Sequence, residues 1–596
     1  MASAPHRQTG LRQQPLVLLM VVLVFCSAMV GRLVWMQLLE GSRFKELADE
    51  NRIRLVPRSP IRGRLLDRKG RVLATSKLTY SLYLEPRLVS DADWPGLRNR
   101  LASLLNLDPL LLDERRDRGT DRDGYRTTLM LDLKPEQVLR FREQALALPG
   151  AQVDVDTLRF YPHGTLAAHA LGYTDPITEN EYKTLSKRGY NIRDRIGRTG
   201  VEHAYESYLR GKWGGQMLEV NAMGEVQRYL GDRPSTAGQD LILTLDLDLQ
   251  RIAEQSLADK PGGAVVALEA STGAVLALAS KPNFDPNFFS KLIKTQKEYN
   301  ALFNNSKEEP LLSRALNPYE PGSTWKPVTA MAGMESGKFP PDTKLRTTSC
   351  ITYGSSCFWD HNSVGFGTIG YADALRFSSN TFFYQVGVGV GSRAMKIAAD
   401  ALGFQQKTGI EFSWEENIGL VGDEDWASKG RDFFEPGTTP WIPEDMASAS
   451  IGQSVVQITP LQLARAYAVF ANGGWLVTPH LYVGGKDWMQ PPFRRKVAIK
   501  PSTLATIRAG LRKVVESGTG GSLNGPGIPP AAGKTGTADD SSGGAAHAWF
   551  ASYAPYPDGE IVVVAFVQNA GGGGSVHALP IAKKVLAVWE QSRKKD

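Results

Sequence analysis

Three short groups of polar residues have the types, spacing and chain order that nucleophilic acyl transfer requires. In the first group, Ser323 follows Pro321-Gly322 and stands three residues before Lys326, where an apolar helical pattern begins and continues to Met334. Residues three apart lie on one face of a helix, so the amine of Lys326 can reach the hydroxyl of Ser323. The helix N-terminus also favours the negative charge that develops there. We expect Ser323 to be a nucleophile and Lys326 its general base.

The second and third groups could handle the proton and the substrate. Ser378 can relay a proton to a leaving amine, and Asn380 can orient the lysine and a substrate amide. Lys534-Thr535-Gly536-Thr537 enters a strand-rich tail, where the lysine and threonines can hold a carboxylate and the glycine lets the backbone approach closely. The predicted catalytic residues are Ser323, Lys326, Ser378, Asn380 and Lys534, and the predicted substrate-binding residues are Thr535, Gly536 and Thr537.

Each group also has a second match in the chain, so no group is specific by itself. The rival matches are Ser42 with Lys45, Ser522 with Asn524, and Lys407-Thr408-Gly409. About one or two Ser-x-x-Lys matches are expected by chance in a chain of this length. The order of the three groups and their local contexts single out Ser323.

The surrounding pattern predicts an α+β domain that positions these groups. We expect a strand at 239–246, a helix at 247–257, and a hairpin of 264–268 with 274–278 around Ser271-Thr272-Gly273. A second hairpin, a final helix and two internal helices are expected at 548–553 with 561–567, 579–591, 461–471 and 502–515. Strands at both ends with helices between them predict one sheet completed by the two ends of the domain.

An apolar segment near the N-terminus predicts a membrane anchor. Residues 16–39 are interrupted mainly by Ser27, Arg32 and Gln37, and a helix of this length spans about 36 Å. The alternative, a cleaved signal peptide, would have a shorter apolar region that ends in small residues. Lysine and arginine flank both ends, so their count does not give the orientation. The predicted parts are a cytoplasmic tail (1–14), the anchor (15–39), a polar spacer (40–237) and the catalytic domain (238–596).

Charge and cysteine content narrow the functional classes. The net charge of the 596 residues is +7, and basic and acidic residues alternate, so nucleic-acid binding is not expected. No cofactor is predicted. Cys350 and Cys357 could form a disulfide outside the cytoplasm, bind zinc together with Asp360 and His361, or stay as free thiols. The residues alone leave these three possibilities open.

Taken together, the chain resembles the class B penicillin-binding proteins over nearly its whole length. Its three groups match the ordered Ser-x-x-Lys, Ser-x-Asn and Lys-Thr-Gly set of penicillin-binding proteins and serine β-lactamases. Further segments resemble motifs of the family, most of them in the spacer: Arg62-Gly63-Arg64-Leu65-Leu66-Asp67-Arg68, Gly197-Arg198-Thr199-Gly200-Val201-Glu202, Tyr205-Glu206, Tyr161-Pro162, Ile451-Gly452-Gln453 and His547-Ala548-Trp549-Phe550.

This resemblance implies a fold and a reaction. The fold would be an elongated, non-catalytic pedestal of the dimerisation type (40–237), followed by an antiparallel sheet with helices on both sides. Ser323 would attack the carbonyl between the two terminal D-alanines of a peptidoglycan stem peptide, and the N–H groups of Ser323 and Thr537 would form the oxyanion hole. β-Lactam antibiotics would acylate the same serine. The catalytic domain would then lie outside the cytoplasmic membrane, in the periplasm.

The resemblance is greatest to the elongation type, penicillin-binding protein 2, and it implies partners. No glycosyltransferase signature is found, so the protein would work beside a polytopic polymerase of the shape, elongation, division and sporulation family and other elongation proteins, on strands derived from lipid II. A septal class B enzyme is the first alternative, and a membrane-bound β-lactamase or a β-lactam sensor follows it. Some elongation-type relatives have a metal-ligating Gly-His-Gly, whereas this chain has Gly365-Phe366-Gly367, so a zinc site like theirs is not expected.

Overall fold

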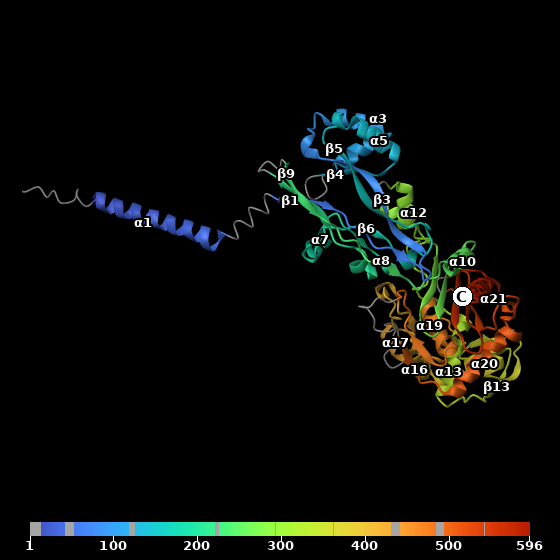
Figure 1. Ribbon diagram of the computed structural model, residues 1–596. Helices are drawn as coiled ribbons and strands as arrows, with labels where there is room; N and C mark the ends of the chain where they lie inside the picture. The colour runs from blue at the N-terminus through green and yellow to red at the C-terminus, as the bar shows by residue number, and fades with distance from the viewer. Residues whose placement is uncertain are drawn as a thin grey trace, which may run out of the picture. The chain divides into compact units, whose positions relative to one another are not determined.

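The computed structural model describes most of the chain (Figure 1). The chain divides into two units. The first unit comprises residues up to 61 together with 211–237, and the second comprises 62–210 and 238–596. The described residues are 14–41, 53–117, 126–220, 226–292, 294–361, 363–430, 441–483, 494–540 and 543–595. The rival match of Ser42 with Lys45 lies outside them.

The first unit contains the predicted anchor. Helix α1 spans Gln14–Val34 and continues as one π-helical turn, η1 (Trp35–Leu39). Residues Pro15–Leu38 form the one helix among the described residues that is long and apolar enough to cross a membrane. The remainder of this unit is an antiparallel sheet in the order β1-β8-β9, formed by Ile53–Arg58, Gly214–Val220 and Val226–Arg233.

The N-terminal part of the second unit is built on one long strand, β3 (Val72–Leu84). It pairs with β4 (Thr127–Leu133) on one edge and β5 (Ala151–Phe160) on the other. The outer end of β3 supports a small helical core in which Leu82 and Leu84 pack against helices of this part. These helices are α3 (Trp94–Leu105), α4 (Pro109–Asp117) and α5 (Pro135–Gln144).

A buried ionic network joins segments of this part that are far apart in the sequence. Glu202 is fully buried, and its two carboxylate oxygens accept hydrogen bonds from Arg62 Nε at 2.7 Å and Arg159 Nε at 2.6 Å. Arg62 also pairs with Glu206 at 2.7 Å. Burial opposes ionisation, but the charges of Arg159 and Arg62 outweigh it and lower the pKa of Glu202. Residues of the 62–68, 197–202 and 205–206 motifs therefore stabilise this part of the fold.

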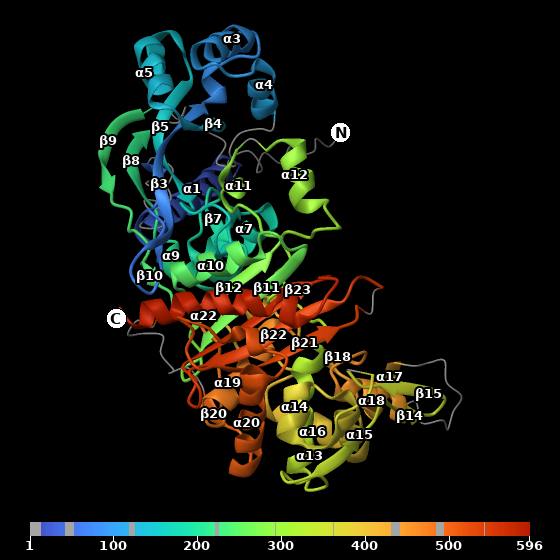
Figure 2. The same ribbon diagram turned by 90° about the vertical axis from the view of Figure 1, so that its right-hand side faces the viewer.

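The C-terminal part of the second unit is a five-stranded antiparallel sheet with helices on both faces (Figure 2). Its strand order is β12-β11-β23-β22-β21, formed by Val275–Lys281, Gly262–Glu269, Ile561–Gln568, His547–Ala554 and Ala532–Ala538. Strand β11 from the first predicted hairpin pairs with β23 from the second. The two ends of the domain thus complete one sheet, as predicted. The strand that contains Lys534, β21, lies at the edge.

Alternating residues of these strands define the two helical layers. Val265 and Ala267 pack with α10 (Leu247–Leu257) and α22 (Leu579–Arg593), whereas Ala264 and Val266 belong to the larger core on the opposite face. This is the two-residue period of a strand that is buried on both faces. Figure 2 shows α22 running along the sheet. The fold class predicted from the sequence is confirmed.

The larger core carries the helices that position the active site. Helix α19 (Pro460–Ala471) is buried along its whole length and contacts β11, β22 and β23. Helix α20 (Pro501–Ser517) packs against α19. The helices that pack against α20 or against one another are α13 (Lys326–Glu335), α14 (Tyr371–Phe377), α15 (Asn380–Val390), α16 (Ser392–Ala401) and α18 (Pro443–Ser450).

The strand expected at 239–246 is much shorter than predicted. Only β10 (Leu241–Ile242) pairs as a strand, in parallel with β2 (Leu65–Leu66). Asp246 then caps α10, because its side chain accepts hydrogen bonds from the backbone N–H groups of Asp248 and Leu249. Leu243 makes an isolated bridge to Tyr482. The strand therefore stays short because Leu243 pairs with Tyr482 instead of extending the ladder with β2.

Candidate active site

Ser323 lies on a tight turn at the N-terminal end of α13. The turn, η5 (Gly322–Trp325), is a 3-10 helix that leads directly into the α-helix at Lys326. Gly322 has φ +53°, and a Cβ there would lie 2.2 Å from the carbonyl oxygen of Thr537. Only glycine combines this backbone conformation with so close an approach. The Gly322 N–H donates to Gly452 O at 2.9 Å, so the 451–453 motif supports the turn.

Lys326 is completely buried beneath this turn and is surrounded by acceptors. Its Nζ donates to Ser378 O at 2.6 Å, Asn380 Oδ1 at 2.7 Å and Ser378 Oγ at 3.2 Å. Among the described residues, these three are the hydrogen-bond acceptors of Lys326, and Ser323 Oγ is not one of them. Burial lowers the pKa of Lys326 well below its usual value, the charge of Lys534 lowers it further, and Asp360 opposes the shift. A neutral amine, the form a general base requires, is therefore accessible.

Ser378 lies between two helices in a conformation that is unusual for serine. It ends α14 and has φ +59°, in the left-handed region. Non-glycine residues adopt this region at a cost, and they keep it where the surrounding structure holds them. Here the carbonyl and hydroxyl of Ser378 both face Lys326. Asn380 begins α15, and its Nδ2 donates to Trp359 O at 3.1 Å, so this amide group is already engaged within the protein.

Lys534 approaches the same serine from the edge strand. It is fully buried, and its Nζ donates to Ser378 Oγ and to Thr535 O, both at 2.9 Å. Burial lowers the pKa of Lys534 to about 7. The three predicted groups therefore converge: Lys326 and Lys534 meet at Ser378 Oγ, although they are far apart in the chain.

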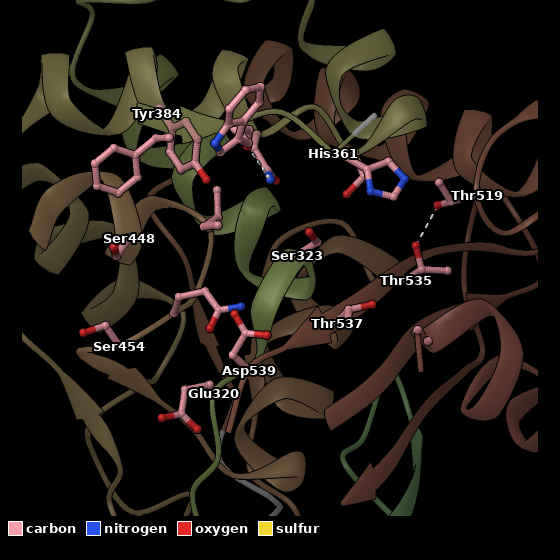
Figure 3. A pocket seen from close by; sticks show the side chains of 18 of the residues that line it. Glu320, Ser323, His361, Tyr384, Ser448, Ser454, Thr519, Thr535, Thr537 and Asp539 are labelled. Carbon is pink, nitrogen blue, oxygen red and sulfur yellow. Dashed lines mark hydrogen bonds between the residues drawn. The ribbon is translucent and has the colours of Figure 1, made fainter. Parts of the chain in front are cut away.

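A cavity of about 740 Å³ contains Ser323 in its lining (Figure 3). Ser323 lies at its centre, with Thr535 and Thr537 on one side and Tyr384 on another. Of the predicted residues, those lining the cavity are Ser323, Ser378, Asn380, Thr535, Thr537, Cys357 and His361. Lys326 and Lys534 contact the lining residues from the protein interior, because each is 0% exposed.

Gly536 allows the close backbone approach that its motif predicted, and the structure shows which segment it approaches. A Cβ at this position would lie 2.8 Å from Pro321 O and 2.8 Å from Thr324 Cγ2. The glycine therefore allows β21 to lie directly against the Ser323 turn. This contact places the Thr537 backbone beside Ser323, where two N–H groups can serve one oxyanion.

Cys350 and Cys357 form a disulfide, one of the three possibilities that the residues left open. It joins the paired strands β14 (Cys350–Tyr353) and β15 (Ser356–Trp359). Both carboxylate oxygens of Asp360 accept hydrogen bonds from protein groups. Among the described residues, no group of three or more His, Cys, Asp and Glu side chains is placed to hold a metal ion. The two cysteines are therefore bonded to each other, and the described residues offer no ligand set for the zinc alternative.

Several residues at the site were missed by sequence reasoning. Thr519 follows α20, lines the cavity and shares a 2.6 Å hydrogen bond with Thr535 Oγ1 (Figure 3). Gly573 and the first residues of α21 (Gly574–His577) line the cavity, and a Cβ on Gly574 would lie 2.0 Å from Trp549 O. Asp360, which was considered only as a metal ligand, contacts the residues after Ser378. Thr519 and Asp360 lie next to motif residues in space but outside any motif, so spacing could not reveal them.

The two rival matches among the described residues, 407–409 and 522–524, do not line the cavity. Lys407 Nζ donates to Ser413 O at 2.6 Å, and Thr408 Oγ1 donates to Glu416 at 2.6 Å, so these residues hold a local loop. Asn524 donates to Val515 O at 2.6 Å. None of these three residues lines the cavity.

Comparisons with known proteins agree with this geometry. The profile described as "Penicillin binding protein transpeptidase domain" matches residues 263–587, and the profile described as "Penicillin-binding Protein dimerisation domain" matches residues 57–243. The first includes every predicted site residue.

Individual relatives match over nearly the whole chain. Peptidoglycan D,D-transpeptidase MrdA of Acinetobacter baumannii is 33% identical, and the match covers 97% of this chain and 87% of the relative. The protein of the same name from Haemophilus influenzae is 31% identical, with 98% and 92% covered. A solved structure titled "Structural coordination of polymerization and crosslinking by a peptidoglycan synthase complex" is 32% identical with a TM-score of 0.72, and covers 98% of this chain and 99% of that one.

Proposed function

We propose that this chain, which belongs to the class B penicillin-binding proteins, cross-links peptidoglycan as an elongation-type D,D-transpeptidase through an acyl-enzyme on Ser323. The observation that carries the assignment of residues is the meeting of Lys326 and Lys534 at Ser378 Oγ, directly beneath the cavity that contains Ser323. The family and the transpeptidase reaction rest on the two profiles and the full-length relatives. The site residues rest on this geometry.

In the first half-reaction, Ser323 Oγ attacks the carbonyl carbon of the penultimate D-alanine. Neutral Lys326 takes the hydroxyl proton, and the new ester bond forms as the peptide bond breaks. Ser378 Oγ, which contacts both lysines, passes a proton to the departing D-alanine amine. The N–H groups of Ser323 and Thr537 stabilise the oxyanion.

In the second half-reaction, the amine of a neighbouring stem peptide attacks the ester. A new amide bond forms and the bond to Ser323 Oγ breaks. Ser378 and Lys326 carry the proton from the attacking amine back to Ser323 Oγ, the reverse of the first half-reaction. Thr535 and Thr537, which line the cavity, hold the carboxylate of the donor stem together with protonated Lys534. Penicillins carry a carboxylate and a reactive carbonyl, so they acylate Ser323 in the same position.

Helix α1 is a single-pass membrane anchor by its length and composition. We place the catalytic domain (238–596) and the pedestal (40–237) outside the cytoplasmic membrane, in the periplasm, because the peptidoglycan substrate lies there. The disulfide between Cys350 and Cys357 supports this placement, since disulfides persist in oxidising compartments.

The polymer to be cross-linked requires a separate polymerase. The relative in the synthase complex is described as part of an assembly that coordinates polymerisation and cross-linking, and the match covers almost all of both chains. We infer that this protein works with a polytopic glycan polymerase of the shape, elongation, division and sporulation family and with other elongation proteins.

The alternatives are less well supported. The relatives from Acinetobacter baumannii and Haemophilus influenzae, which match over nearly the whole chain, are named MrdA, which favours the elongation role over the septal one. A β-lactamase or sensor would not be expected to match the pedestal profile together with full-length transpeptidases.

Covalent labelling tests the assignment of Ser323. The full-length protein in detergent is treated with fluorescent penicillin, and we expect one labelled species in wild type and none in Ser323→Ala. Ser454→Ala is the matched control, because Ser454 also lines the cavity but belongs to no motif; it should be labelled. Labelling that survives Ser323→Ala would refute the nucleophile. Rapid loss of the wild-type label by hydrolysis would favour a β-lactamase.

A further inference from the structure

Asp360 is a buried carboxylate that the reaction described above does not use. Its side chain is 3% exposed. Oδ2 accepts a hydrogen bond from Ser379 Oγ at 2.7 Å and another from Thr381 Oγ1. Oδ1 accepts from the backbone N–H of Asn380 at 2.8 Å and from that of His361 at 2.6 Å. Three of these four donors belong to the residues that directly follow Ser378.

These contacts fix the segment that presents Ser378 to the two lysines. Ser378 has a left-handed backbone conformation, which needs support from its surroundings. The neighbouring Ser379 is completely buried, and its hydroxyl is shared between Asp360 and the Phe382 N–H that it caps. A movement of 379–381 would therefore move acceptors of Lys326, among them the Ser378 carbonyl and the Asn380 amide oxygen.

Asp360 is in turn held by the disulfide-closed hairpin. It follows the last residue of β15, Trp359, which pairs with Cys350. The Asp360 N–H donates to Ser349 O at 2.8 Å, immediately before β14. Trp359 O accepts from Asn380 Nδ2 at 3.1 Å. The hairpin therefore contacts the second motif directly and also holds Asp360 against it.

We propose that Asp360 is a positioning residue for the Ser378–Asn380 motif and that the Cys350–Cys357 hairpin keeps it in place. This inference rests on the proposed function, because the motif must act in acylation for its position to matter. The charge of Asp360 makes each of its hydrogen bonds stronger than a neutral one. In the free protein, the hairpin and Asp360 then hold Ser378 and Asn380 in the geometry that Lys326 requires.

Acylation kinetics can separate this role from general damage. Penicillin acylation of the full-length protein is measured from pH 5 to 9 for wild type, Asp360→Asn and Thr381→Val. We expect the plateau rate constant to fall about 10- to 100-fold in Asp360→Asn and about 3- to 10-fold in Thr381→Val. The charges that act on Lys326 are those of Lys534, which lowers its pKa, and Asp360, which raises it. Asp360→Asn should therefore move the acid limb to lower pH, whereas Thr381→Val should leave it in place.

The hairpin is tested by Cys350→Ser combined with Cys357→Ser. We expect about a 3- to 10-fold lower acylation rate constant. A reducing agent should slow wild type to the same degree and leave the double variant unchanged. Asp342→Asn is the matched control for Asp360→Asn, since Asp342 is exposed in the same domain. This variant should be acylated at the wild-type rate.

The proposal would be overturned if Asp360→Asn were acylated with the wild-type rate constant and its acid limb lay at the same pH as that of wild type. If Asp360→Asn does not fold, wild-type rates in both Thr381→Val and the double cysteine variant would overturn it instead. Failure of the proposed function has a different signature: wild type itself would not be labelled at Ser323.

Discussion

Lys326 and Lys534 direct their amino groups at the same oxygen, Ser378 Oγ, from 3.2 and 2.9 Å. Both lysines are fully buried, so neither charge is solvated by bulk water. Two ammonium groups in one low-dielectric site repel each other, and burial lowers the pKa of each. The site can therefore hold one neutral and one charged lysine near neutral pH, which supplies a base for Ser323 and a cation for a carboxylate.

The first prediction concerns the pH dependence of acylation. Lys326 is a base only above its folded pKa, so acylation should fall as the pH drops through that value. Lys534 binds a carboxylate only while protonated, and its pKa is about 7. The second-order rate constant for penicillin acylation should therefore begin to fall above about pH 7.

A penicillin methyl ester is the control, because it lacks the carboxylate. It should react more slowly, keep the acid limb and lose the alkaline limb. A rate constant for the free acid that rises steadily to pH 10 would contradict the role of Lys534.

The second prediction separates the charge of Lys326 from its basicity. Arginine keeps a positive charge near Ser378 but is not deprotonated in proteins. Lys326→Arg should lower the acylation rate constant by about 10²- to 10⁴-fold, the usual contribution of a general base. The measurement is fluorescent-penicillin labelling over time, with circular dichroism as the check on folding. A folded Lys326→Arg variant that is labelled at the wild-type rate would show that Lys326 is not the base.

The third prediction concerns the close approach at Gly322. An alanine there would place its Cβ 2.2 Å from Thr537 O, at φ +53°. Gly322→Ala should therefore force β21 away from the Ser323 turn, which separates the two N–H groups of the oxyanion hole. We expect a loss of acylation of about 10²-fold or more, as for removal of one oxyanion donor.

Gly337 provides the matched control for this variant. It also has positive φ (+75°), but a Cβ there would meet no atom within 4 Å. Gly337→Ala should cost only backbone strain, about 1 kcal/mol of stability, with acylation unchanged. Equal effects on acylation in the two variants would contradict the importance of the contact with Thr537.

The sequence predicted the motif residues of the site but not the residues that hold them in place. Ser323, Ser378 and Lys534 come together because each belongs to a motif with recognisable order and context. Asp360 and Thr519 act through contacts between segments distant in the chain, so no local spacing indicates them. Among the described residues, Lys326 donates hydrogen bonds to Ser378 and Asn380 and none to Ser323, so its action on the Ser323 hydroxyl stays a prediction.

Parts of the fold show the same limit. The hairpins at 262–281 and 547–568 were predictable because their alternating apolar residues and turn residues are local signals. The early end of the strand after 239 was not, because it depends on Leu243 pairing with Tyr482, which is distant in the chain. Likewise, no periodicity indicates that Glu202 lies between two arginines from other segments.

The fourth prediction concerns that buried network. Glu202 is 0% exposed and pairs with Arg62 and Arg159 at 2.7 and 2.6 Å. Glu202→Gln keeps the size of the side chain but leaves two buried guanidinium groups without their shared carboxylate. We expect the free energy of unfolding to fall by about 3–5 kcal/mol, measured by urea denaturation of the full-length protein in detergent.

Asp240→Asn is the matched control, because Asp240 also pairs with an arginine, Arg64, at 2.6 Å but is 38% exposed. A solvent-exposed pair contributes about 0–1 kcal/mol, so this variant should unfold close to wild type. The pKa of Glu202 is lowered in the folded protein, so its contribution is present above the unfolded pKa and is lost as the pH falls through the folded value. The difference in stability between wild type and Glu202→Gln should therefore shrink in acid. A difference that stayed constant down to pH 2 would mean that the effect comes from packing rather than from charge.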